Sequence, residues 1–528
     1  MSIPLFKVFM NPDVGEPVEK VLLSGFITQG PKVEEFETKL KEYFQWPYIL
    51  TLNSATSGLT LAVHILNLKE DDLIISTPLT CAATNMAIIN GGAGIKWVDV
   101  GEDCNISPVS IKTSIEDKVK GVMVVHWGGN PCDMDAIYKA AGDLPVIQDC
   151  AHAFGSKYDG KFLGTDGKSM AVYSLQAIKH LTTSDGGLIF LPNEELYERA
   201  KLLRWYGISR EKRSGNGDFR LEPDITEIGY KSHMNDLNAT IGIANLPGAV
   251  ENSEKIKYVI NRYRTELSEL KNIKLVQDTV NSEPNYWIFS LLVDKKDEFR
   301  SFMENLGIMT SQVHKRNDVN TCFSKWRCSP SVLSNLDRLE KKLICIPCGW
   351  WLTNREIDKI IRAIKFFDDN QNIDITTLDD LLIKYPEQNI SDKFLSLMNK
   401  FNGYDYSNEF SNEGDFCSRL EHIISSGGTI YVAYSIVDNN LRLFGSVRFN
   451  EEIKFGHNVV HVEDVVVDSS YRSFGFGLFL VKYSTQLYKE RFGLSKIYKI
   501  IIQSKDELFD FYLKCGFKKE GIHYTMRL

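Results

Sequence analysis

Short apolar runs alternate with amphipathic segments through the first two hundred residues, and this alternation limits the folds open to the chain. The runs are PYILTLN (47–53), DLIIS (72–76), GIKWVDV (94–100), GVMVVHW (121–127), PVIQD (145–149), MAVYSL (170–175) and GGLIFLP (186–192). Amphipathic stretches at 56–66, 133–141 and 195–205 separate several of them. Strands that alternate with helices favour a layered α/β domain with a largely parallel sheet. Near-continuous apolar strands suit a sheet that is covered on both faces.

The rest of the chain predicts further domains. Long helical patterns lie at 251–271, 296–306 and 353–367, and the polar run DDNQN (368–372) is typical of a linker. A chain of 528 residues should hold two to four domains at roughly 150 residues each. The predicted boundaries give a large domain over 1–245, a small domain over 246–368, a linker over 369–385 and a final domain over 386–528.

Composition and charge exclude several classes of protein. Hydrophobic residues make up 43% of the chain and charged residues 25%, as in ordinary globular proteins. The net charge of −8 offers no general attraction to nucleic acid or an anionic membrane. The sequence has neither an apolar run of about 18 residues nor a secretion signal at its N-terminus. Its ten cysteines lack the spacing of a disulfide framework. We therefore expect a soluble, cytoplasmic protein that binds neither nucleic acid nor membrane.

Three features of the first domain point to one cofactor. Asp149 ends an apolar run, where a carboxylate would face the crevice at the carboxyl end of a strand. Lys179 follows another run, within SLQAIKHLTTSDGG, and residues 53–56 open a helix after a strand, where free amides favour a phosphate. A lysine for a Schiff base, an acid for a pyridinium nitrogen and a phosphate cup are what pyridoxal phosphate requires. Each feature alone also fits a helix cap or a solvated side chain.

The combination resembles the DegT/DnrJ/StrS-type sugar aminotransferases over residues 1–368. The matching stretches are GFITQGPKVEEFE (25–37), NSATSGLTLAV (53–63), TPLTCAATN (77–85), VVHWGGNPCDMD (124–135), QDCAHAFGSKYDGKFLG (148–164), YSLQAIKHLTTSDGG (173–187) and GYKSHMNDLNATIG (229–242). The resemblance implies the α/β architecture of fold type I pyridoxal-phosphate transferases, with a mixed, mostly parallel sheet flanked by helices in a large domain and a small α+β domain after it. It also implies a nucleotide-sugar substrate and the amino donor pair glutamate and 2-oxoglutarate.

The resemblance assigns roles to individual residues. Lys179 matches the lysine that carries the cofactor and then shuttles protons, and Asp149 matches the acid that keeps the pyridine nitrogen protonated. His152 occupies the position near the phenolic oxygen of the cofactor. The phosphate-binding positions are Ala55, Thr56 and Ser174. Relatives with histidine in place of the lysine act as sugar dehydratases, so Lys179, five residues after Ser174, favours transamination.

Two positions depart from the common family pattern. Cys81 stands where the family often has an aromatic ring stacked on the cofactor. Lys231 stands where many relatives present an asparagine from the neighbouring subunit to the phosphate, and a lysine could act there as a point charge. The resemblance therefore also implies a homodimer with sites at its interface.

Four cysteines raise the alternative of a metal site. Cys345 and Cys348 form a CxxC, with Cys322 and Cys328 upstream. The upstream spacing is wrong for a zinc ribbon, and the CxxC lies in the apolar run LICIPCGWW. We expect buried thiols and no metal.

The C-terminal segment carries a second motif, in HVEDVVVDSSYRSFGFGLFLVKYSTQLY (461–488). An apolar strand runs through Val467, and RSFGFG (472–477) opens an amphipathic helix. Gly475 and Gly477 would let the backbone approach a pyrophosphate, which the free amides of the helix start can bind. A plain glycine-rich turn is the alternative interpretation, but the position between a strand and a helix favours the cradle.

Residues 390–528 resemble the GNAT acetyltransferases, and more narrowly the glucosamine-6-phosphate N-acetyltransferase branch, in HVEDVVVDSSYR, FYLKCGF (511–517) and EEIKFGHN (451–458). The resemblance implies a GNAT α/β domain that uses acetyl-CoA. Backbone amides near Val466 and Val467 would polarise the thioester, and Tyr512 would protonate the leaving thiolate. Glu463 and Asp464 match an acidic pair near the acceptor amine. The pyrophosphate cradle would comprise Arg472, Ser473, Phe474, Gly475, Phe476 and Gly477.

The two chemistries can run in sequence, since transamination creates a primary amine and the second domain consumes one. The sequence therefore predicts a bifunctional enzyme that makes an amino sugar nucleotide, from a 4-keto-6-deoxyhexose, and acetylates the new amine. Two alternatives stay open. The acetyltransferase could act separately on a hexosamine phosphate, or the chain could be a ligand-sensing regulator, although no helix-turn-helix segment accompanies it.

Overall fold

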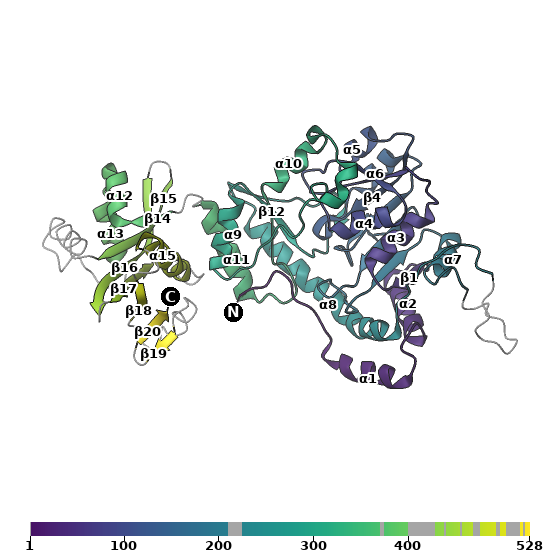
Figure 1. Cartoon of the computed structure of the whole chain (residues 1–528), viewed down its shortest axis with the longest axis horizontal. Coiled ribbons are helices and arrows are strands. Elements are labelled where there is room, and N and C mark those ends of the chain that lie inside the picture. Colours follow the sequence, from purple (N-terminus) through teal and green to yellow (C-terminus); the bar gives the residue numbers. More distant parts are fainter. Residues whose placement is uncertain are drawn as a thin grey trace.

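A computed structural model gives the architecture of the chain (Figure 1). It describes residues 2–209, 224–369, 374–399, 428–437, 440–454, 457–467, 476–492, 497–502, 518–520 and 523–527. None of the described helices is long and apolar enough to cross a membrane.

A seven-stranded sheet in the order β1-β9-β8-β5-β4-β2-β3 forms the centre of the large domain. Its strands are β1 (Ile49–Leu52), β2 (Leu73–Ser76), β3 (Gly94–Trp97), β4 (Val119–Val125), β5 (Val146–Asp149), β8 (Met170–Ser174) and β9 (Gly187–Phe190). The neighbouring pairs β3–β2, β2–β4, β4–β5 and β5–β8 are parallel, and β9 runs antiparallel to both β8 and β1. Each strand overlaps one of the seven predicted runs, although β4 begins before its run, so the mixed, mostly parallel sheet is confirmed.

Helices flank this sheet (Figure 1). They are α1 (Gly15–Ser24), α2 (Pro31–Phe44), α3 (Ala55–Ile65), α4 (Ala82–Asn90), α5 (Pro108–Thr113), α6 (Met134–Ala141) and α7 (Glu194–Leu203). Side-chain caps fix where several of these helices begin. The Ser54 side chain accepts a hydrogen bond from the Ser57 amide at the start of α3, and the side chains of Asp133 and Asn193 likewise accept backbone amide hydrogen bonds at the starts of α6 and α7. A short sheet of β11 (Ser282–Glu283), β6 (Lys157–Tyr158) and β7 (Lys161–Phe162) lies beside them.

The long helix α8 (Asp236–Glu266) leads into the small domain, so the predicted boundary at 245 falls inside a helix. The helix begins at the cap Asn235 and continues through Pro247, whereas the sequence predicted a start at 251. The small domain contains a three-stranded sheet and three helices. These are β10 (Ile273–Leu275), β12 (Phe289–Val293), β13 (Leu343–Ile346), α9 (Lys296–Asn305), α10 (Ser334–Glu340) and α11 (Asn354–Asp369).

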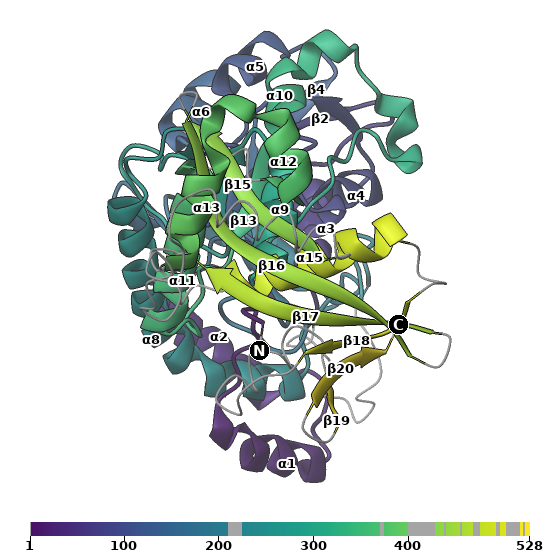
Figure 2. The same ribbon diagram turned by 90° about the vertical axis from the view of Figure 1, so that its left-hand side faces the viewer.

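The C-terminal domain is built on a second seven-stranded sheet, in the order β14-β15-β16-β17-β18-β20-β19 (Figure 2). Its elements are β14 (Asp374–Thr377), α12 (Leu378–Lys384), α13 (Ile390–Asn399), β15 (Thr429–Val437), β16 (Asn440–Lys454), β17 (His457–Val467), α15 (Phe476–Phe492), β18 (Ile497–Ile502), β19 (Lys518–Glu520) and β20 (His523–Arg527).

The linker predicted over 369–385 is wrong in most of its length. Residues 374–377 form β14, which pairs with β15, and 378–384 form α12, which buries Leu378 and Leu381. The Thr377 side chain caps α12. The polar run that suggested a linker ends just before this strand, so the C-terminal domain begins earlier than predicted.

Candidate functional site

The ends of three neighbouring strands build the predicted phosphate cup. Gly187 of β9 pairs with Leu52 of β1 on one side and with Ser174 of β8 on the other. A Cβ atom at Gly187 would lie 2.5 Å from the Ala55 nitrogen, so only glycine lets β9 approach the start of α3 so closely. The amides of Ala55 and Thr56 lie in the first helical turn, where they have no intrahelical acceptor. The geometry fits an anion held between α3 and Ser174.

Asp149 ends β5 and is only 4% exposed. Thr84 Oγ1 donates to its Oδ2 at 2.7 Å, and the Ala151 amide donates to its Oδ1 at 3.0 Å. Burial raises the pKa of Asp149, and these two bonds and the charge of Lys179 act against that rise. A buried carboxylate is costly without a positive partner. The site therefore fits a protonated ring nitrogen, as the sequence predicts.

Lys179 follows β8, and its Nζ lies 3.4 Å from the centroid of the Trp287 ring. Burial lowers the pKa of Lys179 to about 7, although the charges of Asp149 and Cys81 oppose this shift. Much of the lysine is therefore a neutral amine near pH 7, the form that attacks a carbonyl carbon. The structure brings Lys179, Asp149 and Cys81 close enough to interact electrostatically.

His152 contacts two aromatic rings, Trp287 and His314, which also contact each other. Its ring stacks on Trp287 with centroids 4.2 Å apart, and its Nε2 lies 3.4 Å from Nε2 of His314, whose ring is nearly parallel to it with centroids 5.4 Å apart. Its Nδ1 accepts from the Gly128 amide at 3.4 Å. Burial, together with the charges of Lys179 and His314, lowers the pKa of His152 well below its usual range. The imidazole is therefore neutral at physiological pH.

Sequence reasoning missed the parts that the small domain contributes to this site. Trp287 precedes β12 and His314 lies in a loop before β13, more than a hundred residues after Lys179. The Trp287 indole nitrogen donates to the Ile178 carbonyl at 2.9 Å, next to the lysine. Neither residue carries a motif, and only the packing of the two domains brings them to Lys179. Thr84 lies in the quoted stretch 77–85, but its contact with Asp149 also depends on the fold.

Cys81 and Lys231 lie at the margin of the site. Cys81 is exposed and immediately precedes α4. Lys231 places its Nζ 4.6 Å from the Trp205 ring centroid, and its carbonyl accepts from Asn53 Nδ2 at 3.3 Å. The loop at 229–235 therefore borders the phosphate cup of its own chain. The role of Lys231 toward a neighbouring subunit stays a prediction.

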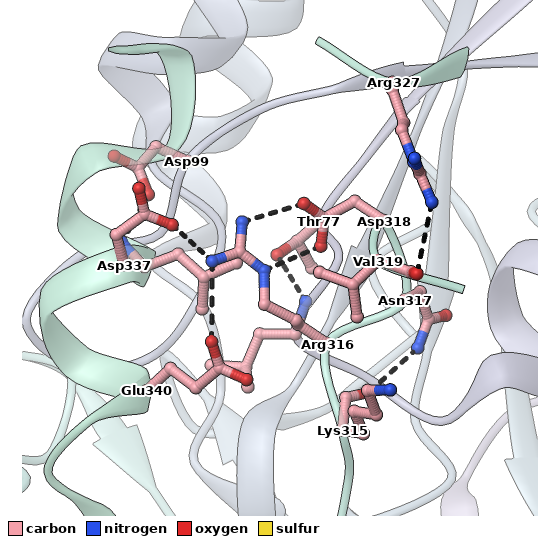
Figure 3. Close-up of polar contacts among 12 residues, drawn as sticks. Thr77, Asp99, Lys315, Arg316, Asn317, Asp318, Val319, Arg327, Asp337 and Glu340 are labelled. Atoms are coloured by element: carbon pink, nitrogen blue, oxygen red, sulfur yellow. Dashed lines mark hydrogen bonds and ion pairs between the residues drawn. The ribbon is translucent and has the colours of Figure 1, made fainter. Parts of the chain in front are cut away.

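A cluster of carboxylates around Arg316 fixes the loop that carries His314 (Figure 3). Arg316 is 8% exposed and binds both oxygens of Asp318 at 2.8 Å, and it also pairs with Asp337 and Glu340 of α10. The next residue, Asn317, donates to the Thr80 carbonyl at 2.9 Å. Because three carboxylates already surround its guanidinium, Arg316 positions this loop against the large domain rather than binding an anion.

The CxxC pair behaves as expected of core residues. Cys345 and Cys348 are both free and buried, and burial raises the pKa of the Cys345 thiol to about 12. The described His, Cys, Asp and Glu residues form no group that could hold a metal ion.

The strand β17 carries the second candidate site. Among the described residues it pairs with β18 over 458–462, while its pairing with β16 continues to Val467. The register with β16 shifts by one residue, so Asp464 has no partner there and forms a β-bulge beside Glu463. Val466 and Val467 thus lie where β17 pairs with β16 alone within the described residues. Phe476 begins α15 and Gly477 follows it, whereas Arg472, Ser473, Phe474, Gly475 and Tyr512 lie outside the described residues.

Comparisons with known proteins agree with this geometry. The DegT/DnrJ/EryC1/StrS aminotransferase family matches residues 10–365, and the acetyltransferase (GNAT) family matches residues 394–517. A UDP-4-amino-4,6-dideoxy-N-acetyl-beta-L-altrosamine transaminase of Campylobacter jejuni is 32% identical over 343 residues, which cover 63% of this chain and 89% of the relative.

Two solved structures extend the likeness. AtS13 from Actinomadura melliaura shares 38% identity at a TM-score of 0.65, covering 69% of this chain and 98% of its own. The sugar aminotransferase CalS13 from Micromonospora echinospora shares 34% identity at a TM-score of 0.65, covering 69% of this chain and 99% of its own. The chain therefore belongs to the DegT/DnrJ/EryC1/StrS aminotransferase family and carries a GNAT acetyltransferase domain at its C-terminal end.

Proposed function

We propose that the chain is a bifunctional enzyme of amino-sugar synthesis. Its first domains transfer an amino group from glutamate to a nucleotide-linked keto-deoxy sugar, a 4-keto-6-deoxyhexose, and its last domain acetylates the new amine with acetyl-CoA. The observation that carries the proposal is the Lys179 amine, whose pKa burial lowers to about 7, beside the buried Asp149 and in the same domain as the phosphate cup. A GNAT domain in the same chain supplies the second reaction.

The residues of the first site fit pyridoxal phosphate, which the family implies. Ala55, Thr56 and Ser174 would hold its phosphate, Asp149 its ring nitrogen, and Lys179 its aldehyde carbon. When bound, the cofactor supplies an electron sink that stabilises negative charge on the adjacent substrate carbon. Lys179 Nζ would take a proton from the amine-bearing carbon of the amino donor and return it to the former aldehyde carbon of the cofactor, and would do the reverse with the sugar, for which a pKa of about 7 is well suited.

The neighbours of Lys179 would support this proton transfer. His152 is neutral and stacks on Trp287, and its Nδ1 accepts from the Gly128 amide, so its Nε2 would donate a hydrogen bond to the phenolic oxygen of the cofactor without adding charge beside Lys179. Trp287 covers one side of the lysine amine. The exposed Cys81 would leave space for a sugar next to the lysine.

The choice of substrate rests on the relatives. One of them is named as a transaminase of a UDP-4-amino-4,6-dideoxy sugar, and a structural relative is named as a sugar aminotransferase. We propose the same class of substrate here, a nucleotide sugar with a keto group at carbon 4.

A homodimer is part of this proposal. Leu22, Leu23, Phe26 and Ile27 of the α1 region are each at least half exposed, and Ile228 beside the 229–235 loop is 84% exposed. Apolar groups of this kind favour burial against a partner. A second copy would cover them and could receive Lys231 at its phosphate cup. Mixing Lys179→Ala with Lys231→Ala subunits should then restore part of the activity, whereas a fully active monomer would contradict the dimer.

The acetyltransferase site would use β17 and the start of α15. An alkyl ammonium must lose a proton before it attacks the thioester, and Glu463 or Asp464 would accept that proton, directly or through water. Amides near Val466 and Val467 would stabilise the developing oxyanion, and Tyr512 would protonate the departing thiolate. The amides of residues 472–477 would hold the pyrophosphate of acetyl-CoA.

Product analysis tests the proposal directly. The protein is incubated with a panel of nucleotide 4-keto-6-deoxy sugars, with and without glutamate and acetyl-CoA, and the products are weighed by mass spectrometry. We expect an amino sugar nucleotide with glutamate alone and its N-acetyl derivative when acetyl-CoA is added. A chain that binds these sugars without consuming glutamate would be a sensor instead.

A further inference from the structure

Five phenylalanine rings join the small domain to the acetyltransferase domain. Phe302 of α9 and Phe366 of α11 belong to the small domain, and Phe444 of β16, Phe476 and Phe479 of α15 belong to the other. Figure 1 shows α9 and α11 on the side of the small domain that faces the C-terminal sheet, and Figure 2 shows that sheet in front of them. We call these five residues the interdomain aromatic cluster.

The contacts across this boundary are direct. The Phe366 ring centroid lies 5.1 Å from that of Phe476 and 5.4 Å from that of Phe444, and Phe302 lies 5.4 Å from Phe479. Phe444 and Phe476 are fully buried, and the exposed fraction of Phe302, Phe366 and Phe479 does not exceed 8%. A domain interface that is this apolar opposes independent motion of the two domains.

The chain connectivity tightens the same boundary. Phe366 lies in the last turn of α11, which ends at Asp369, and β14 begins at Asp374 as a strand of the acetyltransferase sheet. One hydrophobic core runs without interruption from α11 through β14 and β16 to α15. The helix that closes the small domain therefore also packs against the core of the acetyltransferase.

Phe476 gives this packing a functional meaning. It is the first residue of α15, at the end of the RSFGFG segment to which we assign the pyrophosphate of acetyl-CoA. Amides at a helix start bind an anion well only when the helix start is held in place. The ring that fixes the start of α15 from outside its domain is Phe366.

We propose that Phe366 is a positioning residue for the acetyl-CoA site: the aminotransferase unit holds the start of α15 in the conformation that binds the pyrophosphate. This inference rests on the proposed acetyltransferase function. Without the Phe366 ring, the binding-competent conformation is populated less, and the apparent affinity for acetyl-CoA falls by that fraction.

The test compares two neighbouring residues of equal burial. Phe366→Leu removes the ring that contacts Phe476 at the start of α15, whereas Phe367→Leu removes a ring that packs within the small domain, on Phe299 and Phe302 of α9. Both variants are made in the full chain with the cofactor bound, and calorimetric titration with acetyl-CoA gives the dissociation constant. Loss of the aromatic contacts should raise it roughly two- to tenfold in Phe366→Leu, with kcat at saturating acetyl-CoA changed by less than about twofold.

Three readouts decide the outcome. Phe367→Leu should bind acetyl-CoA as the wild type does, and both variants should transaminate normally. If wild type binds acetyl-CoA and Phe366→Leu binds it equally well, or if Phe367→Leu weakens binding as much, the positioning role is refuted. If the wild type does not bind acetyl-CoA at all, the proposed acetyltransferase function itself fails. Phe366→Met, which keeps more side-chain length, replaces Phe366→Leu if thermal melting shows that variant to be unfolded.

Discussion

The buried ion pair between Glu37 and Arg204 offers a stability test of the site's framework. Arg204 is 4% exposed, and its Nη1 donates to Glu37 Oε1 at 2.5 Å and to the Thr51 carbonyl at 3.0 Å. The same Glu37 oxygen accepts from the Thr51 amide at 2.9 Å and from its hydroxyl at 2.8 Å. Arg204 also accepts from the Ser232 amide through its carbonyl, so the pair joins α2, the phosphate-cup strand β1 and the 229–235 loop.

Replacing Arg204 with leucine leaves the Glu37 carboxylate buried without its positive partner. Removing one member of a buried pair costs about 3–5 kcal/mol. With about 2.1 cal/mol/K of unfolding entropy per residue over the aminotransferase unit, the melting temperature should fall by about 4–7 °C. Differential scanning calorimetry of the full chain at neutral pH measures this shift. Arg300→Leu, which removes an arginine from an exposed pair with Asp297, should cost about 0–1 kcal/mol and serves as control.

The pH dependence has a definite sign. Burial raises the pKa of Glu37, but the Arg204 charge and the Thr51 hydrogen bonds outweigh burial and lower it overall. In wild type the ionised carboxylate therefore stabilises the fold above its unfolded pKa of about 4.5, and this contribution is lost as the pH falls through the lower folded pKa. In Arg204→Leu the buried carboxyl should instead take up a proton on acidification. The difference between the two proteins should shrink toward about pH 4–5. The reasoning would be refuted if Arg204→Leu lowered the melting temperature by less than about 1 °C at neutral pH, or if it lowered the melting temperature equally at neutral pH and at about pH 4–5.

Three further predictions concern the reactions. The Lys179→Ala variant should form no amine from the keto sugar, yet it should acetylate a supplied amino sugar normally, because Lys179 lies outside the acetyltransferase domain. Mass detection of both products checks this, and residual amine formation would contradict it. Because burial lowers the pKa of Lys179 to about 7, covalent reattachment of pyridoxal phosphate to cofactor-free enzyme should slow by roughly tenfold per pH unit below that value, followed by visible absorbance; a flat profile down to about pH 5 would count against it. Tyr512→Phe should slow acetyl transfer by roughly a hundredfold or more while glutamate consumption stays unchanged, and equal loss of both activities would argue against a role as the thiolate's acid.

The large-domain strands could be predicted because they are buried on both faces. All four residues of β1, β5 and β9 are buried, and such strands appear in the sequence as continuous apolar runs bounded by turns. Asp149 and Lys179 could be placed near each other because Asp149 ends β5 and Lys179 comes soon after the end of β8, at the edge where the parallel sheet gathers its polar groups.

Elements that depend on distant contacts could not be predicted in the same way. Pro247 and Gly248 read as helix breakers, yet α8 passes through both, and the absence of a Cβ at Gly248 makes room for the Phe9 ring. β14 is a four-residue strand whose identity depends on pairing with β15, far along the chain. Trp287 reaches Lys179 only because the small domain packs on the large one. Local patterns carry no information about such contacts.

The acceptor preference of the acetyltransferase tests the central claim most directly. The kcat/KM for acetyl transfer is measured with two acceptors, the amino sugar nucleotide formed by the first domains and glucosamine 6-phosphate, at the same acetyl-CoA concentration. The sequential pathway predicts that the sugar nucleotide amine is preferred by orders of magnitude. A preference of that size for the hexosamine phosphate would contradict it and would make the two domains separate enzymes in one chain.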